Sequence, residues 1–248
     1  MSAVCAGTIP RILEQLRGNS VADIGCGCGD FALAAACRGF SVAPCDASTE
    51  MTQISNECLA GMGVSAVVDH LPELGTYRCD SYDNVVANFV VNHMPDPDSA
   101  IRGLARVAKL GGLVISTIWT TDFLPHRDLV RQEVERHMNG DQANEGVPRV
   151  IDSWRSVDGL ASVNEAAGLS VLNTELVEWE WATRWESFWL GMNAGIGGTG
   201  EAYLSNPAEI RREIEANVRQ SCERYAGSDG KLRFPCQAAL CVARKAEK

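Results

Sequence analysis

The chain has 248 residues, of which 46% are hydrophobic and 22% charged, a balance that excludes disordered, collagen-like and coiled-coil chains. Its 22 basic and 32 acidic residues give a formal net charge of −10, which argues against nucleic acid or an anionic membrane surface as a partner, because both require clustered Lys and Arg. The sequence contains no run of about 18 uncharged apolar residues, as a membrane-spanning helix requires, and its first twenty residues lack a signal-peptide pattern.

In the first half of the chain, apolar runs of strand length alternate with helical patterns. In chain order we predict a strand over 21–24, a helix over 30–38, a strand over 40–45, a helix over 48–61, strands over 64–68 and 84–91, a helix over 98–109 and a strand over 113–119. Gly39, Gly61 and Gly111 end the three helices, as glycine commonly does. This repetition predicts an α/β fold with a Rossmann-like, doubly wound sheet and helices on both faces.

The second half of the chain breaks this rhythm. We expect helices over 128–138, 158–167 and 207–224, strands over 170–181 and 235–244, and a flexible glycine-rich loop over 195–200. Two segments, about 121–150 and 184–230, interrupt a sheet core of about 1–120, 151–183 and 231–248 within a single domain of residues 1–248. Because ligands of open α/β sheets bind beyond the carboxyl ends of the strands, we interpret the two insertions as a substrate cap.

The ten cysteines fall mostly inside apolar runs, where cysteine behaves as a small buried hydrophobe. We expect them to be reduced and the protein to be cytoplasmic, because disulfides persist mainly in oxidising compartments. Cys26 and Cys28 are separated by one residue, but no second Cys or His pair follows at zinc-site spacing. No metal is therefore expected.

The strongest motif is VADIGCGCGDFALA, residues 21–34, in which a strand runs through three glycines directly into a helix. Glycine permits positive φ and a close approach of the backbone to a ligand, and the free N–H groups of a helix start face that ligand. The nicotinamide pattern G-x-G-x-x-G wants a third glycine where Asp30 stands. An acid there repels a pyrophosphate, whereas it favours the positive sulfonium of S-adenosylmethionine.

The residues DIGCGCG, 23–29, resemble the first motif, D/E-x-G-x-G-x-G, of class I S-adenosylmethionine-dependent methyltransferases. Asp46 stands where that family carries an acid for the ribose hydroxyls, and residues 69–72 look like the loop that borders the adenine. The segment NFVVNHMPDPDSAIRGLARVAKLGG, residues 88–112, is similar to the fourth-strand motif and the following helix of the small-molecule "type 11" branch. The segment WESFWLGMNAGIGG, residues 185–198, and the closing strand look like that branch's substrate insertion.

The resemblance implies a seven-stranded mixed sheet whose last strand is antiparallel. It also implies an enzyme that moves a methyl group from S-adenosyl-L-methionine to an O, N or C nucleophile of a small molecule, including those of secondary metabolism. We expect no nucleic-acid or membrane partner, and a monomer or a homodimer. The cofactor contacts are expected at Asp23, Gly25, Gly27, Gly29, Asp46, Ala47, Met51, Asp69, His70, Leu71, Asn88 and Phe89.

Several of these residues have a simpler interpretation. Asp46 and Asp69 follow strands, where aspartate is common in turns. His93 is a candidate general base, because histidine titrates near neutral pH, but it is also a candidate hydrogen-bonded turn residue. Asn88 either contacts a ligand or ends its strand. We expect His126 to lie at the surface.

Aromatic residues are dense in the two insertions. We predict that Phe123, Trp154, Trp185 and Trp189 line a substrate pocket, because such pockets are mostly apolar and aromatic. Trp185 and Trp189 are four residues apart and share a helix face. The alternative is ordinary packing of the cap. Two other functions stay open for the whole chain: a non-catalytic binding subunit of the same fold, and a nicotinamide oxidoreductase, which Asp30 disfavours.

Overall fold

The computed structural model describes residues 2–121, 124–138, 154–195 and 197–247. The chain divides into two compact units. We call Ser2–Thr121, Asp152–Glu178 and Gln237–Lys248 the sheet unit, and Met1, Asp122–Ile151 and Trp179–Cys236 the helical unit. The helical unit takes in most of both segments that the sequence predicts to interrupt the sheet, and their role as a substrate cap stays a prediction.

A seven-stranded mixed sheet organises the fold, as predicted. Its strands are β1 Ser20–Ile24, β2 Ser41–Asp46, β3 Val67–Val68, β4 Tyr82–Asn88, β5 Ala108–Trp119, β6 Leu169–Thr183 and β7 Leu232–Lys245. They lie in the order β3-β2-β1-β4-β5-β7-β6. The pairs from β3 to β5 are parallel, whereas β7 is antiparallel to β5. The predicted antiparallel last strand is therefore confirmed.

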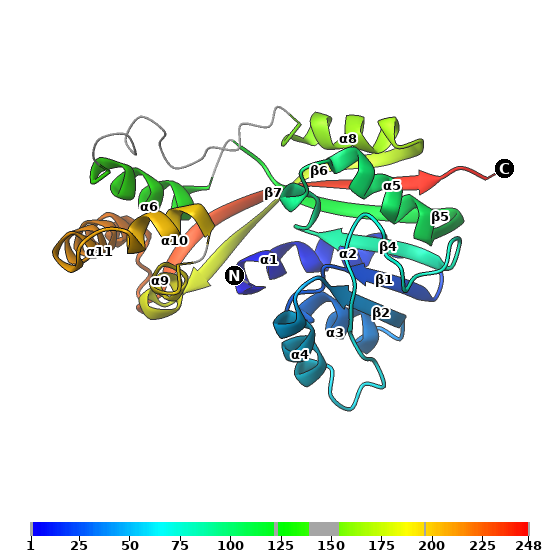
Figure 1. The fold of residues 1–248 in the computed structure, drawn as a ribbon, viewed down its shortest axis with the longest axis horizontal. Coiled ribbons are helices and arrows are strands. Elements are labelled where there is room, and N and C mark those ends of the chain that lie inside the picture. Colours follow the sequence, from blue (N-terminus) through cyan, green and yellow to red (C-terminus); the bar gives the residue numbers. More distant parts are fainter. Residues whose placement is uncertain (1, 122–123, 139–153, 196, 248) are drawn as a thin grey trace. The chain divides into compact units, whose positions relative to one another are not determined.

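Helices cover both faces of the sheet unit. They are α1 Ser2–Cys5, α2 Ile9–Gln15, α3 Asp30–Cys37, α4 Thr49–Cys58, α5 Pro97–Val107 and α8 Val157–Ala166, with the 3-10 turns η1 Ala6–Thr8 and η2 Val91–His93. One hydrophobic core contains Leu104 of α5 and Leu160 of α8, and these two helices lie together in Figure 1. A second core contains Ile12 of α2 and Phe31 of α3.

Several strand ends differ from the sequence prediction, among them the start of β3 at Val67 instead of residue 64 and of β7 at Leu232 instead of residue 235. Two further differences have a backbone reason. β4 ends at Asn88 instead of reaching residue 91, because Phe89 turns into the left-handed region at φ 59°. β5 begins at Ala108, directly after α5, instead of at residue 113. Gly111, at φ 74°, lies in the stretch where the register of β4 on β5 shifts. The sequence suggests that this glycine ends a helix, but in the structure β5 continues through it as an irregular stretch of strand.

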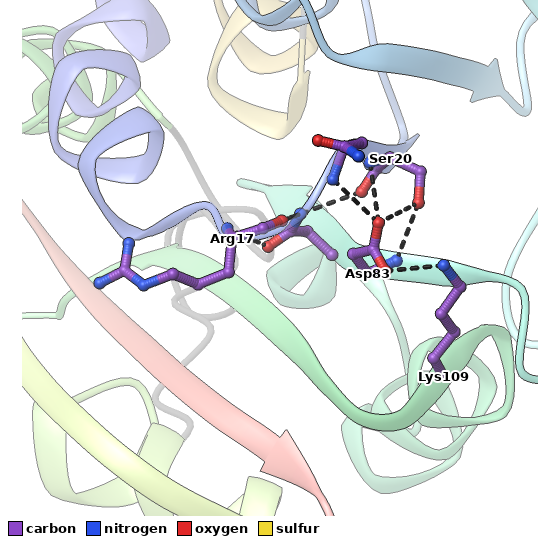
Figure 2. Close-up of polar contacts among 6 residues, drawn as sticks. Arg17, Ser20, Asp83 and Lys109 are labelled. Atoms are coloured by element: carbon purple, nitrogen blue, oxygen red, sulfur yellow. Dashed lines mark hydrogen bonds and ion pairs between the residues drawn. The ribbon is translucent and has the colours of Figure 1, made fainter.

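A polar network fastens the strands at the edge of the sheet where β1 and β4 begin (Figure 2). The Asp83 carboxylate accepts hydrogen bonds from the N–H groups of Asn19 and Ser20, both at 3.0 Å, and from the Ser20 hydroxyl at 2.8 Å. It also pairs with Lys109 Nζ at 2.7 Å. Lys109, together with these N–H groups, holds the pKa of Asp83 well below its usual range. This network ties the starts of β1, β4 and β5 at the edge opposite the glycine motif.

The helical unit contains α6 Pro125–Arg136, α9 Trp185–Asn193, α10 Gly197–Leu204, α11 Ala208–Cys222 and the turn η3 Glu223–Tyr225. Buried Glu133 of α6 accepts a hydrogen bond from Asn217 of α11 at 2.7 Å. The expectation of a flexible loop over 195–200 is wrong, because α10 begins at Gly197. Glycine is needed at residue 200 for packing, since a Cβ there would lie 2.6 Å from the carbonyl carbon of Gly195.

Within the described part of the chain, no helix combines the length and the apolarity needed to cross a membrane. No group of three or more His, Cys, Asp or Glu among the described residues is placed to hold a metal ion. None of the ten cysteines, which all lie among the described residues, is joined in a disulfide.

Candidate functional site

The glycine loop follows β1 and leads directly into α3. Gly25, Gly27 and Gly29 all have positive φ, at 73°, 54° and 86°, so each needs the backbone freedom of glycine. A Cβ on Gly29 would lie 2.8 Å from Ser55 Oγ, whereas a Cβ on Gly27 would meet nothing within 4 Å. Gly27 therefore faces open space, where a ligand can reach the backbone directly.

Asp46, the last residue of β2, shapes this loop. One carboxylate oxygen accepts a hydrogen bond from the Gly27 N–H at 2.9 Å, and the other accepts from the Ser48 N–H at 2.9 Å. Ser48 in turn caps α4 by accepting from the Met51 N–H at 3.2 Å. Ala47 and Met51 therefore lie just after Asp46, at the capped start of α4, and Asp46 joins this helix start to the glycine loop.

Asp23 lies near the end of β1 and is only 1% exposed. Its Oδ2 has no hydrogen-bond partner among the described residues. Burial, and next the charge of Asp46, raise the pKa of Asp23 to about 8. A buried carboxylate with an unsatisfied oxygen is costly to ionise, so Asp23 is a site at which positive charge would be stabilised.

Asp69 organises the loop after β3. It accepts hydrogen bonds from the N–H groups of His70 at 2.8 Å and Thr76 at 2.8 Å, and from the Thr76 hydroxyl at 2.5 Å. Burial opposes its ionisation, but these hydrogen bonds outweigh that effect and lower the pKa of Asp69. His70 is exposed and pairs with Glu73 at 3.2 Å, while Leu71 is buried. The loop role of Asp69 is clear, and the predicted adenine contact stays a prediction.

Asn88 and Phe89 occupy the end of β4. Asn88 Oδ1 accepts hydrogen bonds from the Thr117 hydroxyl at 2.6 Å and the Thr8 hydroxyl at 2.8 Å. The Phe89 N–H donates to the backbone oxygen and the hydroxyl of Thr117 at 3.1 and 3.0 Å. These bonds hold Phe89 in a left-handed conformation that is rare for a bulky residue. Its ring stacks on Trp119, with centroids 4.2 Å apart.

The candidate base His93 ends η2, just beyond β4, and is exposed. Its backbone N–H donates to the Val90 oxygen at 2.9 Å, which is the contact expected of a turn residue. The neighbouring Asn92 is buried, and its backbone oxygen accepts from the Arg155 guanidinium at 2.5 Å. A catalytic role for His93 stays a prediction.

The predicted pocket residues fall in both units of the chain. Trp154 packs against the sheet core, next to Arg155, whose guanidinium lies 5.7 Å from its ring. Trp189 is 2% exposed and is the largest fully buried side chain among the residues that the structure describes. It stacks on Trp185 with centroids 5.1 Å apart, so the two do share a helix face. These positions favour packing over a pocket for Trp154 and Trp189, and Phe123 lies outside the described residues.

The expected surface position of His126 is wrong. His126 is 6% exposed, because the first turn of α6 points it at Trp181 and Phe234, with ring centroids 5.4 and 5.9 Å away. Cys236 Sγ lies 3.9 Å from its Nδ1. Burial lowers the pKa of His126 to about 4. The apolar partners come from strands more than fifty residues away in the sequence, so no local pattern signals this burial.

Comparison with known proteins decides the family. A family model described as a methyltransferase domain matches residues 1–174, which is more than half of the chain. The chain belongs to this methyltransferase-domain family. The match covers the whole glycine loop and the ends of β2, β3 and β4 described above. The family predicted from the glycine motif is therefore confirmed.

Curated relatives of the methyltransferase domain match a shorter segment. Ubiquinone biosynthesis O-methyltransferase from Pectobacterium atrosepticum is 34% identical over 117 residues, 45% of this chain and 48% of the relative. The matched segment thus spans about half the length of the curated relatives.

Solved structures share the fold over nearly the whole chain. The [4+2]-cyclase SpnF has a TM-score of 0.60 at 20% identity, covering 100% of this chain and 82% of that one. Phosphoethanolamine N-methyltransferase 2 from Haemonchus contortus, in complex with S-adenosyl-L-methionine, has a TM-score of 0.55 at 17% identity, covering 98% of this chain and 52% of that one. Because these identities are low, the likeness shows the fold alone, and the site must be argued from its own residues.

The structure adds two residues that no sequence motif singles out. Thr8 is 0% exposed and, with Thr117, supplies the hydroxyls around Asn88. An isolated threonine outside any motif carries no signal by itself. The sequence does offer one hint, the polar Asn88 at the end of an otherwise apolar strand, because a half-buried amide needs hydrogen-bond partners.

Proposed function

We propose that this methyltransferase-domain protein transfers a methyl group from S-adenosyl-L-methionine to an oxygen of a small molecule. The observation that carries the proposal is the open, left-handed Gly27, held by Asp46, whose charge also acts on the buried Asp23. The site offers acidic groups and an exposed backbone at the carboxyl ends of β1 and β2, which suits a cationic ligand without phosphate.

The residues present fit this cofactor. The unpartnered Asp23 Oδ2 is a buried acceptor that positive charge compensates. A carboxylate can accept about four hydrogen bonds. Asp46 accepts two, from the N–H groups of Gly27 and Ser48, so it can accept further hydrogen bonds from ribose hydroxyls. When bound, S-adenosylmethionine supplies a methyl group on a neutral leaving group. The tasks left to the protein are orientation and the exclusion of water.

The name of the curated relatives, O-methyltransferase, supports oxygen over nitrogen or carbon as the acceptor atom. A hydroxyl must lose its proton during attack, so a base near the methyl group is useful. His93 is our candidate, because it is an exposed imidazole beyond the carboxyl end of β4. A cytoplasmic location and a monomeric or homodimeric state are expectations that accompany this proposal.

Titration calorimetry with S-adenosylhomocysteine and with NAD tests the proposal. We expect the first to bind and the second not to bind. Asp46→Ala should weaken S-adenosylhomocysteine binding about 10- to 150-fold, which corresponds to roughly 1.5–3 kcal/mol for hydrogen bonds to a charged group. The matched control is Asp158→Ala, since Asp158 is exposed in the first turn of α8. Binding of NAD alone, or equal affinity of Asp46→Ala and wild type, would contradict the assignment.

A measurement of catalytic turnover distinguishes a methyltransferase from a protein that only binds the cofactor. Formation of S-adenosylhomocysteine should be measured with a panel of catechols, phenols, amines and carbon acids. We expect product with hydroxyl-bearing acceptors. Tight cofactor binding without product from any acceptor class would favour the non-catalytic binding subunit.

A further inference from the structure

A pocket of about 500 Å³ lies in the sheet unit, at the edge where β1, β4 and β5 begin. Segments far apart in the sequence contribute to its lining: the end of α2 with the turn that follows it, the starts of β4 and β5, the early part of β6, and the end of β7 with the tail after it. The glycine loop and the carboxyl ends of β1 and β2 lie at the other end of the strands. The pocket is therefore separate from the candidate cofactor site.

Part of the lining is apolar. Leu113 of β5 and Val242 of β7 line the pocket and are buried. Leu110 and Leu172 line it too, but they stay 48% and 47% exposed. The release of water from apolar surface favours binding, and small-molecule pockets combine such surface with a few polar groups. The two half-exposed leucines are therefore surface that the apolar part of a ligand would cover.

The polar part of the lining includes two charged side chains that neutralise each other and one that does not. Lys109 and Asp83 both line the pocket, and they form the 2.7 Å ion pair described above. Arg17 extends away from this pair (Figure 2), and its Nη1 donates to the backbone oxygens of Glu14 and Leu16 at 3.0 and 2.9 Å. Arg17 thus has no carboxylate partner among the described residues.

Arg244 is a second arginine of the lining without an acidic partner. It lies near the end of β7, opposite Leu113 of β5, and its exposed side chain forms no hydrogen bond or ion pair with any residue that the structure describes. Glu247 is the other acid that lines the pocket, and its Oε1 lies 2.8 Å from the position that a Cβ on Gly111 would occupy. Two arginines and one unpaired carboxylate leave an excess of positive charge here, although the whole chain has a formal net charge of −10.

We propose that this pocket binds a small amphipathic anion, an organic molecule with one carboxylate on an apolar body. The carboxylate is assigned to Arg244, because a guanidinium binds a carboxylate through two parallel hydrogen bonds and the Arg244 donors are not used by other described residues. Arg17 adds positive charge on the same lining, and Leu110 and Leu172 contact the apolar body. An inorganic anion would leave the leucines exposed, and a cation would meet the excess positive charge. The proposal goes beyond methyl transfer and does not depend on it.

An NMR titration of the full chain with octanoate tests the site, with octylammonium as the probe of equal chain length and opposite charge. We expect saturable binding of octanoate, amide shift changes at Gly111, Gly112 and Leu172, and no saturable binding of octylammonium. S-adenosylhomocysteine should leave octanoate binding unchanged, because the two sites are separate. Equal binding of both probes, shift changes away from the pocket, or competition with S-adenosylhomocysteine would overturn the proposal. Failure of S-adenosylhomocysteine to bind would contradict the proposed function alone, and the octanoate titration would still decide this site.

Two exchanges of charged side chains should have opposite effects. Arg244→Gln should weaken octanoate binding about three- to tenfold, the effect of one lost hydrogen bond. Glu247→Gln should strengthen binding, because it removes a like charge beside the ligand carboxylate. Arg102→Gln is the matched control, since Arg102 is exposed on α5, and it should bind octanoate as wild type does. Equal affinity of Arg244→Gln and Arg102→Gln, or weaker binding by Glu247→Gln, would overturn the proposal.

The apolar contact has its own pair of variants. Leu172→Ser should weaken octanoate binding about three- to tenfold, because it removes apolar surface that the ligand covers. Leu176→Ser is the matched control, since Leu176 is 43% exposed on the same strand and lies outside the lining of the pocket. Equal losses in the two variants would show an effect on the strand and not on the ligand contact, and would overturn the assignment of the apolar body to Leu172.

Discussion

Asp23→Asn removes the charge of the most deeply buried carboxylate of the candidate site and keeps the size of the side chain. In the folded protein, burial and the neighbouring Asp46 raise the pKa of Asp23 from 3.8 to about 8. Between these two values, the folded chain keeps the proton on Asp23 while the unfolded chain has lost it. The native state therefore binds more protons, and the free energy of unfolding must fall as the pH rises through this window.

The size of the effect follows from the pKa difference. One pKa unit corresponds to 1.36 kcal/mol, so a shift to about 8 implies a loss on the order of 5 kcal/mol between pH 4 and pH 8. The slope approaches about 1.4 kcal/mol per pH unit inside the window. Above the folded pKa, both states are ionised and the contribution is constant. The amide introduced by Asp23→Asn has no proton to lose, so the variant lacks this slope.

Urea denaturation of the ligand-free protein at pH 5, 6, 7 and 8 measures the difference. Other titrating groups are common to both proteins, so we compare the free energies of unfolding of Asp23→Asn and wild type at each pH. The variant should gain on wild type by up to about 1.4 kcal/mol per unit. Asp46→Asn should lower the upper limit of the window, because the charge of Asp46 contributes to the raised pKa of Asp23 in the folded chain. Parallel curves for Asp23→Asn and wild type would refute the reasoning.

The remaining predictions concern the cofactor contact, the base and the aromatic residues. Asp46→Ala should also speed hydrogen exchange at the Gly27 amide, which loses its acceptor at 2.9 Å; equal exchange would show that Asp46 does not hold the loop. His93→Ala should lower turnover about 10²- to 10⁴-fold with S-adenosylhomocysteine affinity kept if His93 is the base, and full activity in a rate assay would exclude that role. Trp189→Ala should cost about 3–5 kcal/mol of stability in denaturant titration, whereas the partly exposed Trp185 should cost clearly less when replaced by alanine; similar losses would contradict the burial difference.

Most of the sheet was predictable because its signals are local. Strands buried on both faces produce short apolar runs, and the helices between them carry glycine stops and polar caps. The glycine loop was also predictable, since three closely spaced glycines between a strand and a helix have few other uses. Positive φ at Gly25, Gly27 and Gly29 confirms that expectation residue by residue.

The sequence predictions fail where a contact with another part of the chain determines the conformation or the burial of a residue. Phe89 leaves the strand because Thr117, 28 residues later, holds its N–H. Gly200 lies inside α10, where a Cβ would meet the Gly195 backbone, so this glycine serves packing within a helix although glycine usually indicates a loop. The alternative of pocket or core for Trp189 depends on which rings surround it, and a helical pattern reports only that the two tryptophans share a face. The periodicity of apolar residues describes a single helix or strand, whereas the burial of a side chain depends on several elements that pack around it.

The three acids at the carboxyl ends of the strands explain why the ligand of this site should be a cation. Asp69 is satisfied by its own loop, through Thr76 and neighbouring N–H groups. Asp46 is partly satisfied by Gly27 and Ser48. Asp23 alone keeps a buried oxygen without a partner among the described residues. A phosphate ligand would repel the Asp46 carboxylate and further oppose the ionisation of Asp23, whereas a positively charged ligand would favour the ionised form of both. Because these acids are unequally satisfied, we expect the ligand at this site to carry positive charge, and we expect the open backbone at Gly27 to allow its close approach.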